Sequence, residues 1–404
     1  MELLHVERIE MLLLVAAVVA MLARRLRLPY TVGLTLAGLG LAVFPSAVDL
    51  RLTKELIFTA FLPPLIFEAA FHIHWRELRR DMAVVMVLAT LGVLLAAAVT
   101  AGGLYLIAGW EWPAALLLGV LISATDPVSV IATFKEAGVK GRLRLLVEAE
   151  SLFNDGVVAV LFAVALAATT GGSVGAGGVA WSFVATMLGG VLCGGLMAGG
   201  LLLLAWRTTD HLVEITFTTV AAYGSFVLAE HFHLSGVLAT MTAGLVIGNT
   251  GALGAISDRG REAVESFWEY VGFVANSLIF LLIGISTGVE KLSAVWQAAV
   301  IVIALVTVGR AVAVYACCAL FAGSRLRVSM AHQHVLFWGG LRGALALALA
   351  LGLPATVPHH DAIVSVCFAV VAFSVIAQGV TMTPLLRKLG EVPAPVPREA
   401  QQPV

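Results

Sequence analysis

Long apolar runs recur along the whole 404-residue chain. A helix needs ~20 mostly apolar residues to cross the hydrocarbon core of a bilayer, so these runs predict membrane-spanning helices. The predicted spans are 8–23, 30–44, 55–71, 82–108, 113–134, 145–168, 180–206, 211–230, 234–250, 268–289, 292–321, 329–353 and 359–386. The pattern therefore predicts an all-α polytopic membrane protein with 13 transmembrane helices.

Composition supports this class. Hydrophobic residues make up 60% of the chain and charged residues 12%, with a formal net charge of -1, which excludes a soluble globular domain and gives no sign of a nucleic-acid partner. Almost no chain remains outside the spans, so we expect one membrane transport domain over 1–404. The four cysteines lie within apolar runs, where disulfides, metal ligation and bound cofactors are not expected.

Lysine and arginine positions predict the topology. Of the 24 basic residues, 18 fall in the connections on one side of the predicted spans, four fall on the other side, and Arg310 and Arg342 lie inside spans. Because cytoplasmic connections are enriched in basic residues, we expect the C-terminus in the cytoplasm and the N-terminus outside the cell membrane. Glu2, Glu7 and Glu10 precede or begin the first span, so we expect it to stay as a helix rather than to be cleaved as a signal.

An odd number of spans is compatible with two inverted repeats joined by a linker helix. Residues 8–168 would form spans 1–6, residues 180–206 the linker and residues 211–388 spans 8–13, followed by a short cytoplasmic tail at 389–404. Span 5 then corresponds to span 12. Thr125-Asp126-Pro127 would interrupt the first of these, because proline removes a backbone donor, and the GGLRG segment 339–343 would interrupt the second. The alternative for the glycines is close helix packing.

Ionisable residues predicted deep inside the spans point to function. The acids are Glu68, Asp126, Glu150 and Asp155, and the bases are Arg310 and Arg342. Asp126 lies ~20 Å and Asp155 ~15 Å along its span, near the middle of a ~30 Å hydrocarbon core. Four carboxylates face two permanent positive charges, so up to two acids must bind a proton, bind a cation or be hydrated. A carboxylate that holds a proton and a cation alternately is what an antiporter needs.

Helical spacing suggests which side chains share the ion. Ser151 and Asp155 lie four residues apart on one face of span 6, and Glu150 and Asn154 form a second such pair on the neighbouring face. A hard monovalent cation prefers oxygen ligands, so we expect a site for such a cation at Asp155, Asp126, Thr125 and Ser151. The alternatives are a bond from Ser151 to its own helix and, favoured for Asn154, a helix-to-helix hydrogen bond.

Four motifs together resemble the monovalent cation:proton antiporters of the NhaP and eukaryotic sodium/proton exchanger type. They are FLPPLIFEAAF at 61–71, ATDPV at 124–128, ESLFNDG at 150–156 and GGLRGA at 339–344, in order and at fitting spacing. The resemblance covers nearly the whole membrane domain. It implies an NhaA/NhaP-like fold with crossed discontinuous helices, a homodimer, and an elevator-like motion of a core domain in the inner membrane.

The resemblance also implies roles for individual residues. Asp155 would be the carboxylate for which the cation and the proton compete, and Asp126, Thr125 and Ser151 would lie beside it. The Asn154-Asp155 pair is similar to the branch that exchanges one sodium for one proton without net charge movement. Supporting roles follow for four more residues: Glu150 would pair with Arg310, Arg342 would stabilise the crossed helices, and Glu68 would act near the ion site.

Other functional classes were weighed against antiport. A proton-coupled organic-solute transporter fits less well, because the predicted site is compact, rich in oxygen and poor in aromatic residues. An intramembrane aspartyl protease would also use two acids, but Asp155 lacks the Gly-x-Gly-Asp setting and the buried arginines would have no purpose. We therefore expect a secondary transporter, with Na+, Li+ and K+ left open as the cation.

Overall fold

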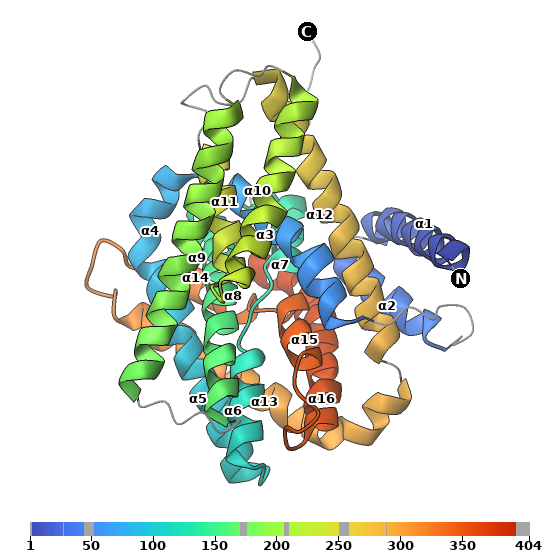
Figure 1. The fold of residues 1–404 in the computed structure, drawn as a ribbon. Helices are drawn as coiled ribbons and strands as arrows, with labels where there is room; N and C mark the ends of the chain where they lie inside the picture. The colour runs from blue at the N-terminus through green and yellow to red at the C-terminus, as the bar shows by residue number, and fades with distance from the viewer. Residues whose placement is uncertain are drawn as a thin grey trace.

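A computed structural model describes residues 2–26, 28–43, 52–169, 176–205, 210–249, 258–287 and 289–392, and within these ranges the regular structure is entirely helical (Figure 1). In chain order the helices are α1 (Glu2–Leu26), α2 (Tyr30–Leu41), η1 (Leu56–Phe61), α3 (Leu62–His72), α4 (Trp75–Val87), η2 (Leu88–Gly92), α5 (Val93–Ile107), α6 (Trp112–Leu121), α7 (Val128–Ala137), α8 (Arg142–Thr169), α9 (Ala176–Ala205), α10 (His211–His231), α11 (Gly236–Asn249), α12 (Asp258–Thr287), α13 (Val289–Ala319), α14 (Met330–Trp338), α15 (Ala344–Leu351), α16 (His360–Phe373), η4 (Ser374–Gln378) and α17 (Gly379–Lys388). The η segments are π-helical turns that continue the helices beside them. The predicted all-α fold is confirmed.

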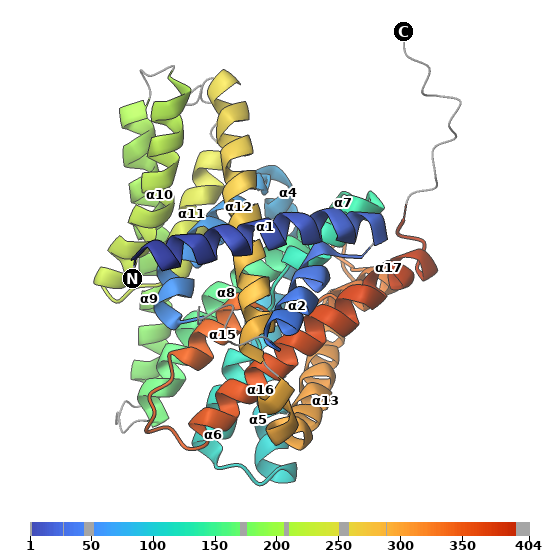
Figure 2. The same ribbon diagram turned by 90° about the vertical axis from the view of Figure 1, so that its right-hand side faces the viewer.

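Helix lengths bear on how many segments cross the membrane. Among the described residues, 7 helices are long and apolar enough to span a bilayer, and five shorter apolar helices accompany them. The Glu10–Ala23 part of α1 is one of these shorter apolar segments, and α1 runs across α12 (Figure 2). Thirteen crossings therefore stay a prediction. The ends of several predicted spans, the basic residues Arg27, Arg51, Arg207 and Arg398, and most of the predicted tail lie outside the described residues.

Two predicted helix interruptions are present and touch one another. Helix α6 ends at Leu121 and α7 begins only at Val128, while α14 ends at Trp338 and α15 begins at Ala344. The extended residues between the helices are connected, because the backbone amide of Asp126 donates to the carbonyl oxygen of Leu341 at 2.8 Å. Pro127 cannot donate a backbone hydrogen bond, and the glycines of the second break permit close approach of neighbouring side chains. The predicted crossed discontinuous helices are confirmed.

Helices pack mainly within two groups. One group contains α2, α3, α9, α10, α11 and α12, and the other contains α4, α5, α6, α8, α13, α15 and α16. Figure 1 shows α9 to α12 beside one another and α5, α6, α13 and α16 gathered at the opposite end. The broken helices belong to the second group, where the α6–α7 break meets the α14–α15 break. The first group covers this crossing from the side of α3 and α12.

Glycines fix how closely α2 and α12 approach. A Cβ atom on Gly38 would lie 2.2 Å from the carbonyl oxygen of Leu281, and one on Gly284 would lie 2.3 Å from the carbonyl oxygen of Thr35. The rings of Tyr30 and Phe273 lie 6.2 Å apart further along the same pair. Backbone contact of this kind requires the absence of side chains and holds two membrane helices together. Helix α12 is therefore firmly attached to α2.

Candidate functional site

A cavity lies where the two helix groups meet at the crossing of the broken helices. The cavity has a volume of about 60 Å³, several times the 10–15 Å³ that one water requires. One wall comes from the 62–69 segment and from Asn276, Ile279 and Phe280, and the other from 124–128, Leu152, Asp155 and 343–346. Most of the lining is apolar. The few polar groups therefore determine what can bind.

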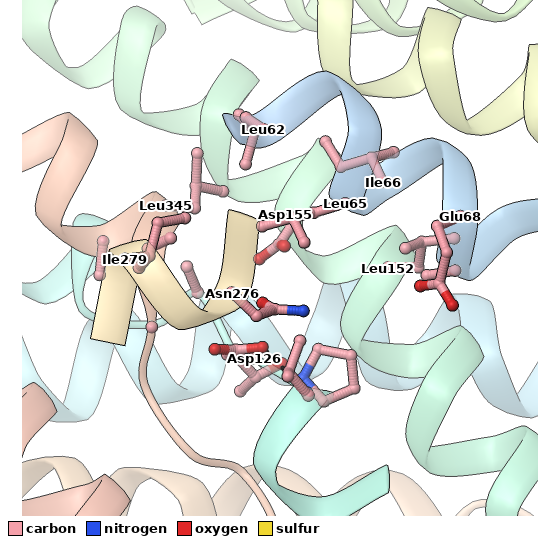
Figure 3. Close-up of a pocket in the computed structure, with 18 of the residues that line it drawn as sticks. Leu62, Leu65, Ile66, Glu68, Asp126, Leu152, Asp155, Asn276, Ile279 and Leu345 are labelled. Carbon is pink, nitrogen blue, oxygen red and sulfur yellow. Dashed lines mark hydrogen bonds between the residues drawn. The ribbon is translucent and has the colours of Figure 1, made fainter. Parts of the chain in front are cut away.

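Asp155 and Asp126 both face this cavity (Figure 3). Neither residue is fully buried, although each lies deep in the protein, because the cavity reaches them. Asp155 Oδ1 has no hydrogen-bond partner, and no basic side chain in the described ranges lies within 4.0 Å of either carboxylate. Asp126 Oδ1 accepts from the amide of Val128 at 2.9 Å. Two carboxylates without a fixed counter-charge can hold a cation or protons.

Gly343 leaves room for the Asp126 carboxylate beside the break between α14 and α15. A Cβ atom at this position would lie 2.3 Å from Asp126 Oδ2, which no real side chain would tolerate. The GGLRG segment thus brings its backbone against the acid. Because residue 343 has no side chain, the α14–α15 break can lie directly against the aspartate of the α6–α7 break.

Thr125 and Ser151 are bonded to one another. The Ser151 hydroxyl donates to the carbonyl oxygen of Thr125 at 2.6 Å, and the Thr125 hydroxyl donates to Ser151 Oγ at 3.1 Å. Thr125 lines the cavity, whereas Ser151 lies behind it and does not. The structure thus gives Ser151 a partner on the broken helix rather than on its own helix. Its place among the ion ligands stays a prediction.

Asn154 lies next to Asp155 and ties α8 to the end of α6. Its Nδ2 donates to the carbonyl oxygen of Ser123 at 3.2 Å, which is the helix-to-helix bond favoured from the sequence. Its Oδ1 is buried without a hydrogen-bond partner. This bond fixes the rotation of α8 at the point where Asp155 projects into the cavity.

Glu150 and Arg310 form a buried ion pair away from the cavity. Arg310 Nη1 and Nη2 donate to the two carboxylate oxygens at 2.7 and 2.9 Å, and the side chains are 2% and 7% exposed. Arg310 also donates to the carbonyl oxygen of Leu336, the last turn of α14. A fork-to-fork pair of this geometry is strong and specific. It removes Glu150 from the acids that are free to bind a cation.

Arg342 stabilises the crossing rather than the cavity. Its side chain is buried, and Nη1 donates to the carbonyl oxygens of Ile122 and Ala124, which follow the C-terminal end of α6. Its backbone amide donates to Ser374 Oγ. Carbonyl groups at a helix C-terminus carry partial negative charge, so a cation there is favourable. The guanidinium of one broken helix thus caps the other.

Glu68 forms the more exposed end of the cavity. Its side chain is 29% exposed, and Oε1 lies 3.6 Å from His72 Nδ1. Figure 3 shows Glu68 at some distance from the two aspartates, with Leu152 towards it. A carboxylate at this position can attract a cation to the opening before it reaches the deeper acids.

Asn276 of α12 was not predicted from the sequence. It lines the cavity, and Figure 3 shows its amide between Asp126 and Asp155. The available signal was a lone amide in the middle of the apolar run 268–289. Such a polar side chain needs a partner inside a membrane protein. Charge balance does not identify Asn276, because its side chain carries no charge.

Comparisons with known proteins agree with this geometry. The family model described as "Sodium/hydrogen exchanger, transmembrane" matches residues 12–388. The chain is 38% identical to the Na(+)/H(+) antiporter ApNhaP of Aphanothece halophytica over 369 residues, covering 90% of this chain and 70% of the relative. It is 35% identical to the Na(+)/H(+) antiporter NhaH of Halobacillus aidingensis over 396 residues, covering 95% and 97%. The fold matches the sodium proton antiporter MjNhaP1 of Methanocaldococcus jannaschii with a TM-score of 0.79 and 20% identity, covering 96% of this chain and 99% of that one.

Proposed function

The chain belongs to the sodium/hydrogen exchanger family, and from this premise we propose that it exchanges a monovalent cation for H+ across the cell membrane. It is a secondary transporter rather than an enzyme, so the ions are substrates and no resident cofactor is involved. Na+ is the first candidate because the similar proteins are named for it, with Li+ and K+ as the other cations to test.

The observation that carries the proposal is the state of Asp155. Its carboxylate reaches a cavity deep in the protein that is large enough for water, has an unpartnered Oδ1, and has no basic side chain within 4.0 Å among the described residues. The two deep arginines are engaged elsewhere, with Glu150 and with the carbonyl groups that follow α6. An ionised carboxylate there is stable with a cation beside it, and a protonated one is stable without. Cation and proton therefore compete for Asp155.

The ion ligands proposed around Asp155 are Asp126, Thr125 and Ser151. Asp126 and Thr125 supply oxygens at the cavity wall, and Ser151 holds Thr125 in position through two hydrogen bonds. We propose an electroneutral exchange of one cation for one proton. Asn154 supports this stoichiometry, since the residue next to Asp155 is a neutral amide engaged with Ser123 rather than a second free acid.

Movement of one helix group against the other supplies alternating access in this proposal. The cavity lies between the groups, and the wall contributed by α3 and α12 is mainly apolar, which suits sliding. Such elevator motion would carry Asp155 from one face to the other. We further propose inverted repeats at 8–168 and 211–388 around the linker 180–206, a homodimer, and the N-terminus outside with the C-terminus in the cytoplasm.

Purified protein in sealed proteoliposomes tests the proposed exchange. Adding Na+ or Li+ should dissipate an imposed pH gradient, and Asp155→Asn should abolish the response because an amide cannot exchange a proton for a cation. Clamping the membrane voltage with K+ and valinomycin should leave the Na+-driven rate unchanged if exchange is electroneutral. Retained exchange in Asp155→Asn would show that another group carries the ion.

A further inference from the structure

We propose that Asn276 is an affinity-determining residue of the transport site that acts on only one side of the membrane. Its amide oxygen would contact the cation beside Asp155 in the arrangement seen here and would lose that contact when the two helix groups move. The inference rests on the proposed exchange at Asp155 and concerns which residues set the affinity there.

The Asn276 side chain has no partner within the protein as described. The residue is 7% exposed, and none of the described residues forms a hydrogen bond with its amide. An amide that has no partner within the protein needs water or a ligand in that place. The cavity is the only such space that it borders among the described pockets. Its role is therefore to be found in what occupies the cavity.

The amide of Asn276 is placed to interact with the site both when a cation is bound and when the cation has left. Figure 3 places it between the two carboxylates, with Asp155 on one side and Asp126 on the other. The amide has an oxygen that accepts and an NH2 group that donates. The oxygen can face a bound cation, and the NH2 group can donate to a carboxylate when the cation has left. A neutral amide does this without adding charge to a site that already holds two acids.

The helix that carries Asn276 is what makes the effect one-sided. Helix α12 is held against α2 through the backbone contacts of Gly38 and Gly284, so Asn276 moves with the α2 group. Asp155 and Asp126 belong to the other group, on α8 and on the break before α7. Relative movement of the groups therefore separates the amide from the acids. Within its own group, Asn276 is the neutral polar side chain at the wall facing Asp155, and Glu68 lies at the opening.

The Glu68 end of the cavity indicates on which membrane face Asn276 would set the cation affinity. Glu68 lines the cavity with a side chain that is 29% exposed, and His72 contacts it on α3. Lys135 pairs with Glu269 on the exposed end of the same α7 and α12 helices. Lys135 directly follows the predicted span 113–134 and is one of the 18 basic residues on the side predicted to be cytoplasmic. Asn276 would thus set cation affinity on the cytoplasmic face and leave the opposite face unaffected.

The test compares apparent cation affinity from each face. Initial rates of Na+-driven proton movement are measured in right-side-out and in everted membrane vesicles carrying the full chain. For Asn276→Leu, which keeps a similar volume, the Na+ KM should rise about tenfold on the cytoplasmic face, the change expected for loss of one polar ligand. On the other face it should change by less than about twofold, with maximal rates within about twofold on both.

Ser277→Ala is the matched control. Ser277 is the next residue on α12, is fully buried and has an unpartnered hydroxyl, but it does not line the cavity. Its KM values should equal those of the unchanged protein. If Asn276→Leu folds poorly, Asn276→Ala takes its place in the two vesicle assays. The Na+-induced rise in melting temperature of the detergent-solubilised variant then reports affinity without distinguishing the faces, and it should need more Na+ than in the unchanged protein.

Three results would overturn the inference. Unchanged KM values in both Asn276 variants would show that the amide does not contact the cation, and equal rises on both faces would show a general packing effect. In either case wild-type exchange would remain, and the proposed function would stand. If the unchanged protein moves no protons in response to any of the cations, the proposed function fails, and this inference fails with it.

Discussion

The buried pair of Glu150 and Arg310 should respond to mutation in a way that depends on which partner is removed. Arg310→Ala leaves a carboxylate that is 2% exposed without its two charge-assisted hydrogen bonds. Glu150→Ala leaves a guanidinium that is 7% exposed, with only the carbonyl oxygen of Leu336 as partner. Breaking a buried pair from one side is destabilising by about 3–5 kcal/mol, because one charge stays uncompensated.

This loss should be visible as reduced thermal stability. At about 2–4 °C per kcal/mol, each single variant should melt on the order of 10 °C below the unchanged protein. A carboxyl group can shed its charge by binding a proton, whereas a guanidinium stays charged. Arg310→Ala should therefore recover part of its stability on acidification from pH 8 to pH 5, and Glu150→Ala should not.

Melting curves of detergent-solubilised protein provide the assay, with the double variant as the control. Removing both partners removes both charges, so the double variant should lose much less than the sum of the single losses. Additive losses would refute the reasoning, since they would mean that the two side chains do not interact in the folded protein. Equal pH responses of the two single variants would also refute it, because charge would then not be the cause.

Three further predictions concern the crossing and its surroundings. Gly343→Ala should abolish transport or slow it at least about tenfold in proteoliposomes, because the new methyl group would overlap the Asp126 carboxylate. The same overlap should lower the free energy of unfolding by about 1–3 kcal/mol. Normal transport in this variant would contradict the close approach of Gly343 to Asp126. Arg342→Gln should reduce the melting temperature and the transport rate together, since the carbonyl groups after α6 lose a cation, while an unchanged melting temperature would argue against that role. Lys135→Gln should shift the melting temperature by less than about 2 °C, because its pair with Glu269 is largely exposed, and a large loss would contradict this.

Much of the architecture could be predicted because the bilayer imposes it on the sequence. Helices occur along every apolar run that lies within the described residues, and both interruptions fall where the Asp-Pro and Gly-rich segments occur. Proline and glycine act on the backbone locally, so their effect can be predicted without knowledge of partners. Charge balance likewise predicted that up to two of the deep acids lack a basic partner, whereas the pairing of Glu150 with Arg310 was implied by the family resemblance. The features that depend on the local sequence, namely the helices and their interruptions, could therefore be predicted.

The remaining features depend on packing between distant segments. Ser151 lies behind Thr125 rather than in the cavity, because the extended residues after α6 lie between the two. Asn276 reaches the acids only because α12 is held against α2 and crosses the cavity. Neither position follows from helical spacing, which orders residues on one helix and says nothing about the helix opposite. Neutral polar residues in apolar runs are the signal that charge counting misses.

The pH dependence of the Na+ KM tests the central claim, that cation and proton share Asp155, most directly. Initial rates are measured in proteoliposomes over a range of Na+ concentrations at successive pH values. Competition for one carboxylate predicts that the KM rises as pH falls, approaching about tenfold per pH unit on the acid side, while the rate at saturating Na+ stays constant. A KM that is independent of pH, with a saturating rate that falls instead, would contradict the account.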